Sequence, residues 1–351
     1  MTKDEAIRFK DVDLSQQEVL ECCYSSWYSI FREFSVKSII IKPLKPRFLQ
    51  YLQDESIRLP DGVEELEINS DNEYSDWEQE QETEVEYFKS EEFQNLKSMI
   101  EQDIQQLGGC VAPKLNWSAP IDAAWVNAGN TIKCTSVNDI LLLLKSSDHI
   151  MSDLQHPLIE VNDQDNEIAV SNGTIEYELV LRKWENINPA LEFRVFIHNN
   201  HIIGISQRDL NHYIFLQELK PKFKSLIDDF VNKKVIPKFK LSKFIIDVYI
   251  PSPYNKVVII DINPFSRKSD PLLFTWNELL TEEIDHNGQE YEFRLVNQQN
   301  LGRFAKKEYS ENQVPLDMID AAQNVDSLVE LAREWSKLQV KQDENDGSDD
   351  K

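Results

Sequence analysis

The sequence predicts an α+β fold, because helical periodicity and short strands alternate along the chain and two of the strands form an antiparallel hairpin. Apolar residues recur at helical spacing over 15–34, which predicts an amphipathic helix. Asn199-Asn200 separates two apolar, β-branched stretches, 191–198 and 201–207, and is typical of a hairpin turn. Two further strands, 244–250 and 257–264, each carry one Asp within an apolar run.

The other predicted elements follow in chain order. A short apolar strand at 39–41 ends before two prolines. The next helix begins at Ser90, a suitable N-cap with two glutamates in the first turn after it, and ends at Gly108-Gly109. The remaining predictions are a helix at 137–145, a strand at 176–184, a helix at 214–234, and helices near 270–280 and 325–339.

The strongly negative net charge of the chain excludes some classes of binding partner. The chain has 351 residues, a formal net charge of -25 and a pI of about 4.6. Such a negative field repels nucleic acid and anionic membrane surfaces, so neither is expected as a partner. Acidic residues dominate 61–89 and the tail 341–351, which we interpret as a disordered, solvated insertion and tail rather than as dedicated binding segments.

The cysteines and the N-terminus indicate a compartment. The four cysteines show no CxxC spacing, which fits reduced thiols in the cytoplasm. The N-terminus lacks the apolar core of a signal peptide, and no apolar run approaches membrane-spanning length. We therefore expect a cytoplasmic protein without membrane contact, and we expect it to be a monomer.

Asp247 and Asp261 stand out, because an unpaired carboxylate inside an apolar strand is costly and needs a partner. Side chains alternate along a strand, so Asp261 and Asn263 project from one face, and Asp247 on the neighbouring strand supplies a third oxygen ligand. Three such oxygens suit Mg²⁺, which usually completes its shell with water and phosphate oxygens. Buried ion pairs produce similar patterns, and the spacing alone favours neither interpretation.

Two segments carry groups suited to a nucleotide, although each also has an ordinary structural explanation. Lys114 ends a short strand before a polar turn and could bind phosphate, but no glycine-rich phosphate loop is present, and an ordinary surface lysine is favoured. The strand 179–184 becomes basic at its end, where Lys183 and Trp184 could flank a purine. A sheet-edge strand with a core Trp explains that segment at least equally well.

The hairpin strands supply further cations. Glu192 and Arg194 share one strand face, and Arg208 follows the partner strand, so both arginines could project into one cleft. A planar guanidinium suits phosphate, because it can bond two oxygens at once. The alternative is a pair of surface arginines in salt bridges with Glu192 or Asp209, each worth less than about 1 kcal/mol.

Taken in order, these segments resemble the cell division cycle protein 123 family. The resemblance covers most of the chain, from the helix near residue 20 to VPLD at 314–317. Its motifs are long and unusual, which makes chance similarity an unsatisfactory explanation. The residues that carry it are PKLNWSAP at 113–120 with Asp122-Ala123, LRKW at 181–184, EFR at 192–194, GISQRD at 204–209, Asp247, and DINPF at 261–265.

The resemblance implies an ATP-grasp fold, in which two α+β subdomains clasp ATP and Mg²⁺ between them. It also implies a chaperone that binds the gamma subunit of eukaryotic translation initiation factor 2 and promotes its union with the alpha subunit, which supports translation initiation and cell-cycle progression. The domain organisation that follows is an N-terminal helical part at 1–60, the acidic insertion at 61–89, a first subdomain at 90–175, a second at 176–340 with the Mg-ATP site, and the tail at 341–351.

The same resemblance assigns residues to the nucleotide. Lys114 would contact phosphate, and the turn with Asn116, Ser118 and Ala119 would replace a glycine-rich loop. Arg182, Lys183 and Trp184 would hold the adenine, and Glu192 would line the ribose side. The phosphates would meet Arg194 and Arg208, and Mg²⁺ would be held by Asp247, Asp261 and Asn263.

The resemblance implies no catalytic residue, and it leaves an alternative. An ATP-grasp ligase that forms an acyl phosphate would use the same ATP residues together with a pocket for a carboxylate and a nucleophile, and the sequence identifies no such pocket. A scaffold whose nucleotide site has decayed is a weaker alternative, because Lys114 and the strand carboxylates are intact.

Overall fold

The structure is a computed structural model of the whole chain, and it describes residues 12–54, 56–60, 87–127, 129–158, 161, 175–281 and 291–297. The acidic tail, the helix predicted at 325–339 and most of the acidic insertion lie outside these residues. At the end of the insertion, residues 87–89 are helical, and both Tyr87 and Phe88 are buried.

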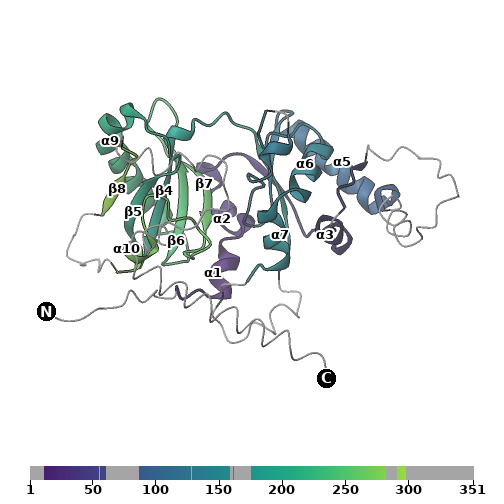
Figure 1. Cartoon of the computed structure of the whole chain (residues 1–351), viewed down its shortest axis with the longest axis horizontal. Coiled ribbons are helices and arrows are strands. Elements are labelled where there is room, and N and C mark those ends of the chain that lie inside the picture. Colours follow the sequence, from purple (N-terminus) through teal and green to yellow (C-terminus); the bar gives the residue numbers. More distant parts are fainter. Residues whose placement is uncertain are drawn as a thin grey trace, which may run out of the picture.

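The first of two sheets has three antiparallel strands in the order β1-β3-β2. They are β1 Ser38–Ile41, β2 Val111–Lys114 and β3 Leu179–Lys183. Helices α3 Pro46–Gln53, α5 Glu91–Gln106, α6 Val137–Lys145 and α7 Asp148–Gln155 accompany this sheet (Figure 1). Their apolar faces form one core with the strands, because each helix repeats apolar residues every three or four positions.

The second sheet has five strands in the order β7-β6-β4-β5-β8, antiparallel except for the parallel pair β5 and β8. They are β4 Glu192–His198, β5 His201–Gln207, β6 Phe244–Tyr249, β7 Val258–Asn263 and β8 Glu292–Arg294. Helix α9 Ile214–Phe230, extended by a π-helical turn at Val231–Val235, contributes its buried residues to the main core beside this sheet. Helix α10 Trp276–Thr281 and the loop before it belong to a smaller core that includes Phe196 and Ile245 of the sheet.

The N-terminal helices α1 Gln16–Glu21 and α2 Tyr24–Phe31 lie between the two sheets (Figure 1). The buried Trp27 and Phe31 join the core of the five-stranded sheet. The Tyr24 amide donates to the Asn116 carbonyl beyond β2 at 2.9 Å. The N-terminal segment therefore packs against both halves of the fold. A 3-10 turn at Arg32–Phe34 connects α2 to the first sheet, and others lie at Ala124–Val126 and Pro189–Leu191.

The structure confirms the α+β class and most predicted elements. Ser90 caps α5 by accepting from the Phe93 amide, and Gly108 and Gly109 end that helix region with φ of 99° and 85°. Asn199 and Asn200 both have positive φ, as a tight hairpin turn requires. The helix predicted over 15–34 is instead two helices, because the chain turns at Cys22-Cys23. The strand predicted at 176–184 lies at the centre of its sheet rather than at the edge.

Phe31→Ala tests the packing of the N-terminal segment. The Phe31 side chain is fully buried and its ring lies 6.0 Å from that of Phe239, so truncation leaves a cavity. We expect a loss of about 3–5 kcal/mol in the free energy of unfolding, measured by urea denaturation. Ser29→Ala on the exposed side of α2 is the control, and an equally small loss in both variants would contradict this packing.

The thiols should differ in reactivity. Burial raises the pKa of Cys23 to about 12, and it also raises the pKa of Cys22 and of Cys134 above the ordinary thiol value. Because the thiolate is the nucleophile, these three should resist iodoacetamide at about pH 8 in the native protein. Cys110 is only partly buried and should be alkylated first, as mass spectrometry would show. Equal native rates for all four thiols would contradict the burial.

Candidate functional site

A line of charged side chains crosses the five-stranded sheet on one face. Arg194 on β4 lies directly opposite Asp247 on β6, and Asp247 lies directly opposite Asp261 on β7. Directly paired residues of antiparallel strands project from the same face, so the register alone brings these three groups together. The alternation that predicts the Asp strands therefore also aligns their carboxylates.

Asp247 and Arg194 form a buried, two-bond ion pair. The Arg194 Nε and Nη2 atoms donate to the two Asp247 oxygens at 2.8 Å each, and Nη1 donates to the Asp270 carbonyl at 2.7 Å. Burial alone would raise the pKa of Asp247, but the charge and hydrogen bonds of Arg194 outweigh it and hold that pKa below its ordinary value. Burial would likewise lower the pKa of Arg194, and Asp247 raises it instead.

Lys114 and Asp261 join the two sheets. Lys114 ends β2 of the three-stranded sheet and is fully buried, and its ammonium lies 2.7 Å from Asp261 Oδ2 on β7. The ammonium also donates to the Trp117 carbonyl, and Asp261 Oδ1 accepts from the Ile262 amide at 3.1 Å. Lys114 is therefore not the surface lysine that the sequence favoured when taken alone.

Arg208, Arg182 and Glu192 surround these two pairs. Arg208 Nη1 donates to Glu192 Oε2 at 3.4 Å, and Arg208 Nε lies 3.5 Å from Asp247 Oδ2 without hydrogen-bond geometry. Arg182 Nη1 reaches the Ile260 carbonyl at 3.4 Å, again across the two sheets. Burial raises the pKa of Glu192, and the positive charge of Arg208 opposes that shift.

The turn after β2 has mainly structural contacts. The Asn116 amide donates to the Glu176 carbonyl at 2.9 Å and accepts from the Glu178 amide at 3.1 Å, so it fastens the turn to the start of β3. The Ser118 backbone amide donates to Asp153 on α7 at 2.9 Å. Ala119 follows in a partly buried position. These contacts fix the shape of the turn beside Lys114.

The end of β3 lies between its two neighbours. The Lys183 amide donates to the Lys37 carbonyl at 2.8 Å, and the Trp184 amide donates to the Cys110 carbonyl at 3.0 Å. Lys183 is exposed and its ammonium pairs with Glu185, while Trp184 is partly buried. Their side chains thus lie apart from the ion pairs of Asp247 and Asp261 in the contacts that the structure records.

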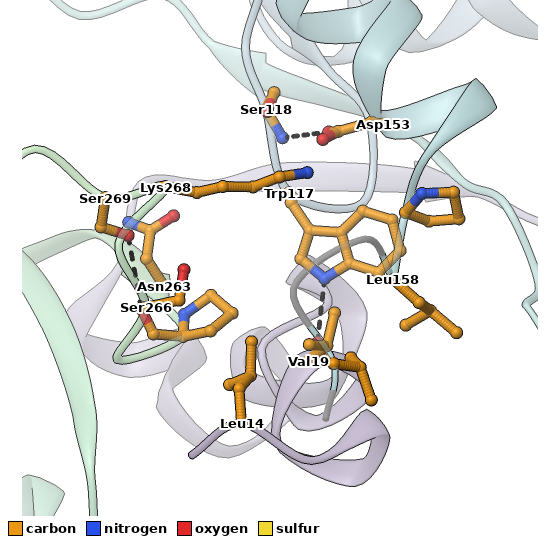
Figure 2. A pocket seen from close by; sticks show the side chains of 13 residues that line it. Leu14, Val19, Trp117, Ser118, Asp153, Leu158, Asn263, Ser266, Lys268 and Ser269 are labelled. Carbon is orange, nitrogen blue, oxygen red and sulfur yellow. Dashed lines mark hydrogen bonds between the residues drawn. The ribbon is translucent and has the colours of Figure 1, made fainter. Parts of the chain in front are cut away.

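Asn263 lies at the other end of this site, in a pocket between the two subdomains. Figure 2 shows it facing a space lined by Trp117 and Ser118 of the turn after β2 and by Ser266 and Lys268 of the loop after β7. Asp153 also lines this pocket, and burial raises its pKa while Ser118 and Lys114 oppose the shift. Asn263, two positions after Asp261 on β7, and Ser118 are thus predicted residues that line an open space.

The charges of this cluster fit an anionic ligand. Four cations (Lys114, Arg182, Arg194 and Arg208) face three carboxylates (Asp247, Asp261 and Glu192). The Nε atoms of Arg182 and Arg208 are buried and have no hydrogen-bond partner among the described residues. An unpaired buried donor destabilises the folded state, and a ligand atom that accepts a hydrogen bond from it would remove that cost. A carboxylate has about four acceptor sites, so Asp247 and Asp261 can also coordinate a metal alongside their present partners. Mg-ATP therefore fits the residues present.

Sequence reasoning missed Asp153, Ser266 and Lys268. Asp153 lies three positions after the buried Ile150 on α7, so it flanks the buried face of that helix. That spacing could have marked it as more than a surface acid. The loop at 264–275 offers no comparable signal, because its position depends on packing against the sheet face and not on a local periodicity.

Comparisons with known proteins place the chain in a family. The sequence profile of the D123 family matches residues 27–322. The "Translation initiation factor eIF2 assembly protein" of Lodderomyces elongisporus is 49% identical over 371 residues, which cover 97% of this chain and 95% of that protein. The "Cell division cycle protein 123" of Candida glabrata is 43% identical over 362 residues, covering 100% of both.

A solved structure agrees with these sequences. The structure of Cdc123 from Schizosaccharomyces pombe is 35% identical, has a TM-score of 0.67, and covers 82% of this chain and 99% of that one. The fold is therefore shared with that protein, and it belongs to the α+β class expected from the sequence. The chain belongs to the D123 family, whose relatives include proteins named cell division cycle protein 123.

Asp247→Asn tests the central ion pair. The substitution keeps the shape but removes the negative charge that compensates the buried Arg194 guanidinium, so we expect a loss of about 3–5 kcal/mol in the free energy of unfolding at neutral pH. Asp229→Asn is the matched control, because its pair with Lys233 is exposed and should contribute little. A loss for Asp247→Asn no larger than that of the control would refute the compensation.

Proposed function

We propose that the chain is an assembly chaperone that binds Mg-ATP between its two subdomains, engages the gamma subunit of eukaryotic translation initiation factor 2, and promotes its union with the alpha subunit. The observation that carries the assembly role is the similarity to relatives named as assembly proteins of this factor, which extends over almost the whole chain. The chain works in the cytoplasm, where this factor is needed. No helix in the described ranges has the length and apolarity to cross a membrane.

The charged cluster between the sheets supports the nucleotide part of the proposal. Lys114, Arg194 and Arg208 bind the phosphates, and the partnerless Nε atoms of Arg182 and Arg208 supply further donors. Asp247, Asp261 and Asn263 hold Mg²⁺, which neutralises phosphate charge when bound. The purine lies toward the end of β3, beside Lys183 and Trp184, and Glu192 lines the ribose side.

Nucleotide binding at this position would stabilise the arrangement of the two halves. Lys114 and Arg182 belong to the three-stranded sheet, while Arg194, Arg208 and the two aspartates belong to the five-stranded one. A ligand that contacts both groups adds its binding free energy to the closed arrangement, about 2.7 kcal/mol at 100 times its Kd.

Asp261→Asn tests the metal and nucleotide assignment. The amide keeps a hydrogen-bond acceptor for Lys114 but has no charge for a divalent cation, so we expect ATP affinity in the presence of Mg²⁺ to fall at least about tenfold. Calorimetric titration measures the affinity, and titration in EDTA measures the part that does not need metal. Asp229→Asn serves as control. Undiminished Mg²⁺-dependent affinity in Asp261→Asn would remove this carboxylate from the site.

A capture experiment tests the partner. We expect immobilised chain to retain the purified gamma subunit, to retain more of it with Mg-ATP than with EDTA, and to show little ADP release. Retention of neither gamma nor the gamma–alpha pair would contradict the assembly role. Rapid ADP release on addition of a carboxylate and an amine would support the ligase alternative instead.

A further inference from the structure

The pocket beside Asn263 combines an apolar wall with a polar end. It has a volume of about 140 Å³, and Figure 2 shows its position between α1, the turn after β2 and the loop after β7. A cavity of about 150 Å³ can hold a molecule the size of benzene, so one amino-acid side chain fits. The apolar wall is formed by Leu14, Val19, Trp117, Pro157, Leu158 and Val161.

The polar end has two groups that lack partners. Ser266 is 4% exposed, and no hydrogen bond of its hydroxyl occurs within the described part of the chain. The Asn263 side-chain amide is likewise without a hydrogen bond to any described residue. Both side chains line the pocket, so the Ser266 hydroxyl and the Asn263 amide can each donate a hydrogen bond to a ligand oxygen at this end.

The charges at the rim define the ligand further. Figure 2 shows the Lys268 ammonium extending toward the Ser118–Asp153 hydrogen bond, and that ammonium also contacts the His156 carbonyl at 3.3 Å. Lys268 and Asp153 are close enough to interact electrostatically. A positive and a negative group on one rim suit a ligand with a carboxylate and an N–H donor close together.

We propose that this pocket binds the α-carboxylate of an aliphatic amino-acid residue. Lys268 and Ser266 hold the carboxylate, Asp153 accepts the adjacent N–H, and the side chain lies against Leu158 and Val19. A free amino acid and the C-terminal residue of a peptide share this chemistry, because both place an N–H on the carbon that bears the carboxylate. The binding requires neither ATP nor phosphoryl transfer, and the pocket borders the proposed Mg²⁺ site at Asn263.

Calorimetric titration of the full chain, without nucleotide or Mg²⁺, tests the inference. The probes are L-leucine, N-acetyl-glycyl-L-leucine, its C-terminal amide, and glycine. We expect one of the two leucine carboxylates to bind with one site per chain, and the amide and glycine to bind at least about tenfold more weakly. Binding of L-leucine would identify a free amino acid as the ligand, and binding of the acetylated dipeptide alone would identify a peptide C-terminus.

Two variants assign the binding to this pocket. Lys268→Met and Ser266→Ala should each weaken binding of the preferred probe, the first at least about tenfold. Lys256→Met, an exposed lysine before β7, is the matched control and should leave the affinity unchanged. The inference fails if neither leucine carboxylate binds at millimolar concentration, or if the affinity is the same in Lys268→Met as in the control.

Discussion

The ion pair between Lys114 and Asp261 connects the two halves of this protein. Lys114 is fully buried at the end of β2 in the three-stranded sheet, and its partner Asp261 lies on β7, an edge strand of the five-stranded sheet. A buried ammonium without a counter-charge costs several kcal/mol. The folded state is therefore stable only when the two sheets pack so that Asp261 lies within contact of the Lys114 ammonium. Two further contacts lie beside this pair. Arg182 of the three-stranded sheet donates to the Ile260 carbonyl on β7, and the Trp117 indole donates to the Val19 carbonyl on α1.

This arrangement gives the site its chemistry. Each of the two strand aspartates has a basic partner, Asp247 with Arg194 and Asp261 with Lys114, so both carboxylates are compensated without a ligand. In the proposed complex, a nucleotide with a divalent cation would add contacts to these pairs, with the metal at the remaining acceptor sites of the aspartates and the phosphates at the cations. Strand register already fixes the positions of the carboxylates.

The alternation of side chains and the turn residues in the sequence predict which strand residues share a face and which strands form the hairpin. The period of two in the strands predicted that Asp261 and Asn263 share a face, and the hairpin at Asn199-Asn200 predicted the pairing of β4 with β5. The contact between Lys114 and Asp261 spans 147 positions in sequence and depends on how two subdomains pack, which no local period encodes. The same holds for Ser266, whose loop takes its place from the sheet that it covers, and for Asn116, whose side chain fastens the turn to the segment before β3.

The most direct test of this account is a double-mutant cycle at the boundary between the subdomains. Lys114→Met, Asp261→Asn and the double variant are unfolded in urea without nucleotide, and the coupling free energy is taken from the four stabilities. If the buried pair joins the halves, the coupling is favourable by about 1–3 kcal/mol, and the double variant is less destabilised than the sum of the single variants. Additive effects within about 0.3 kcal/mol would contradict the central role of this pair.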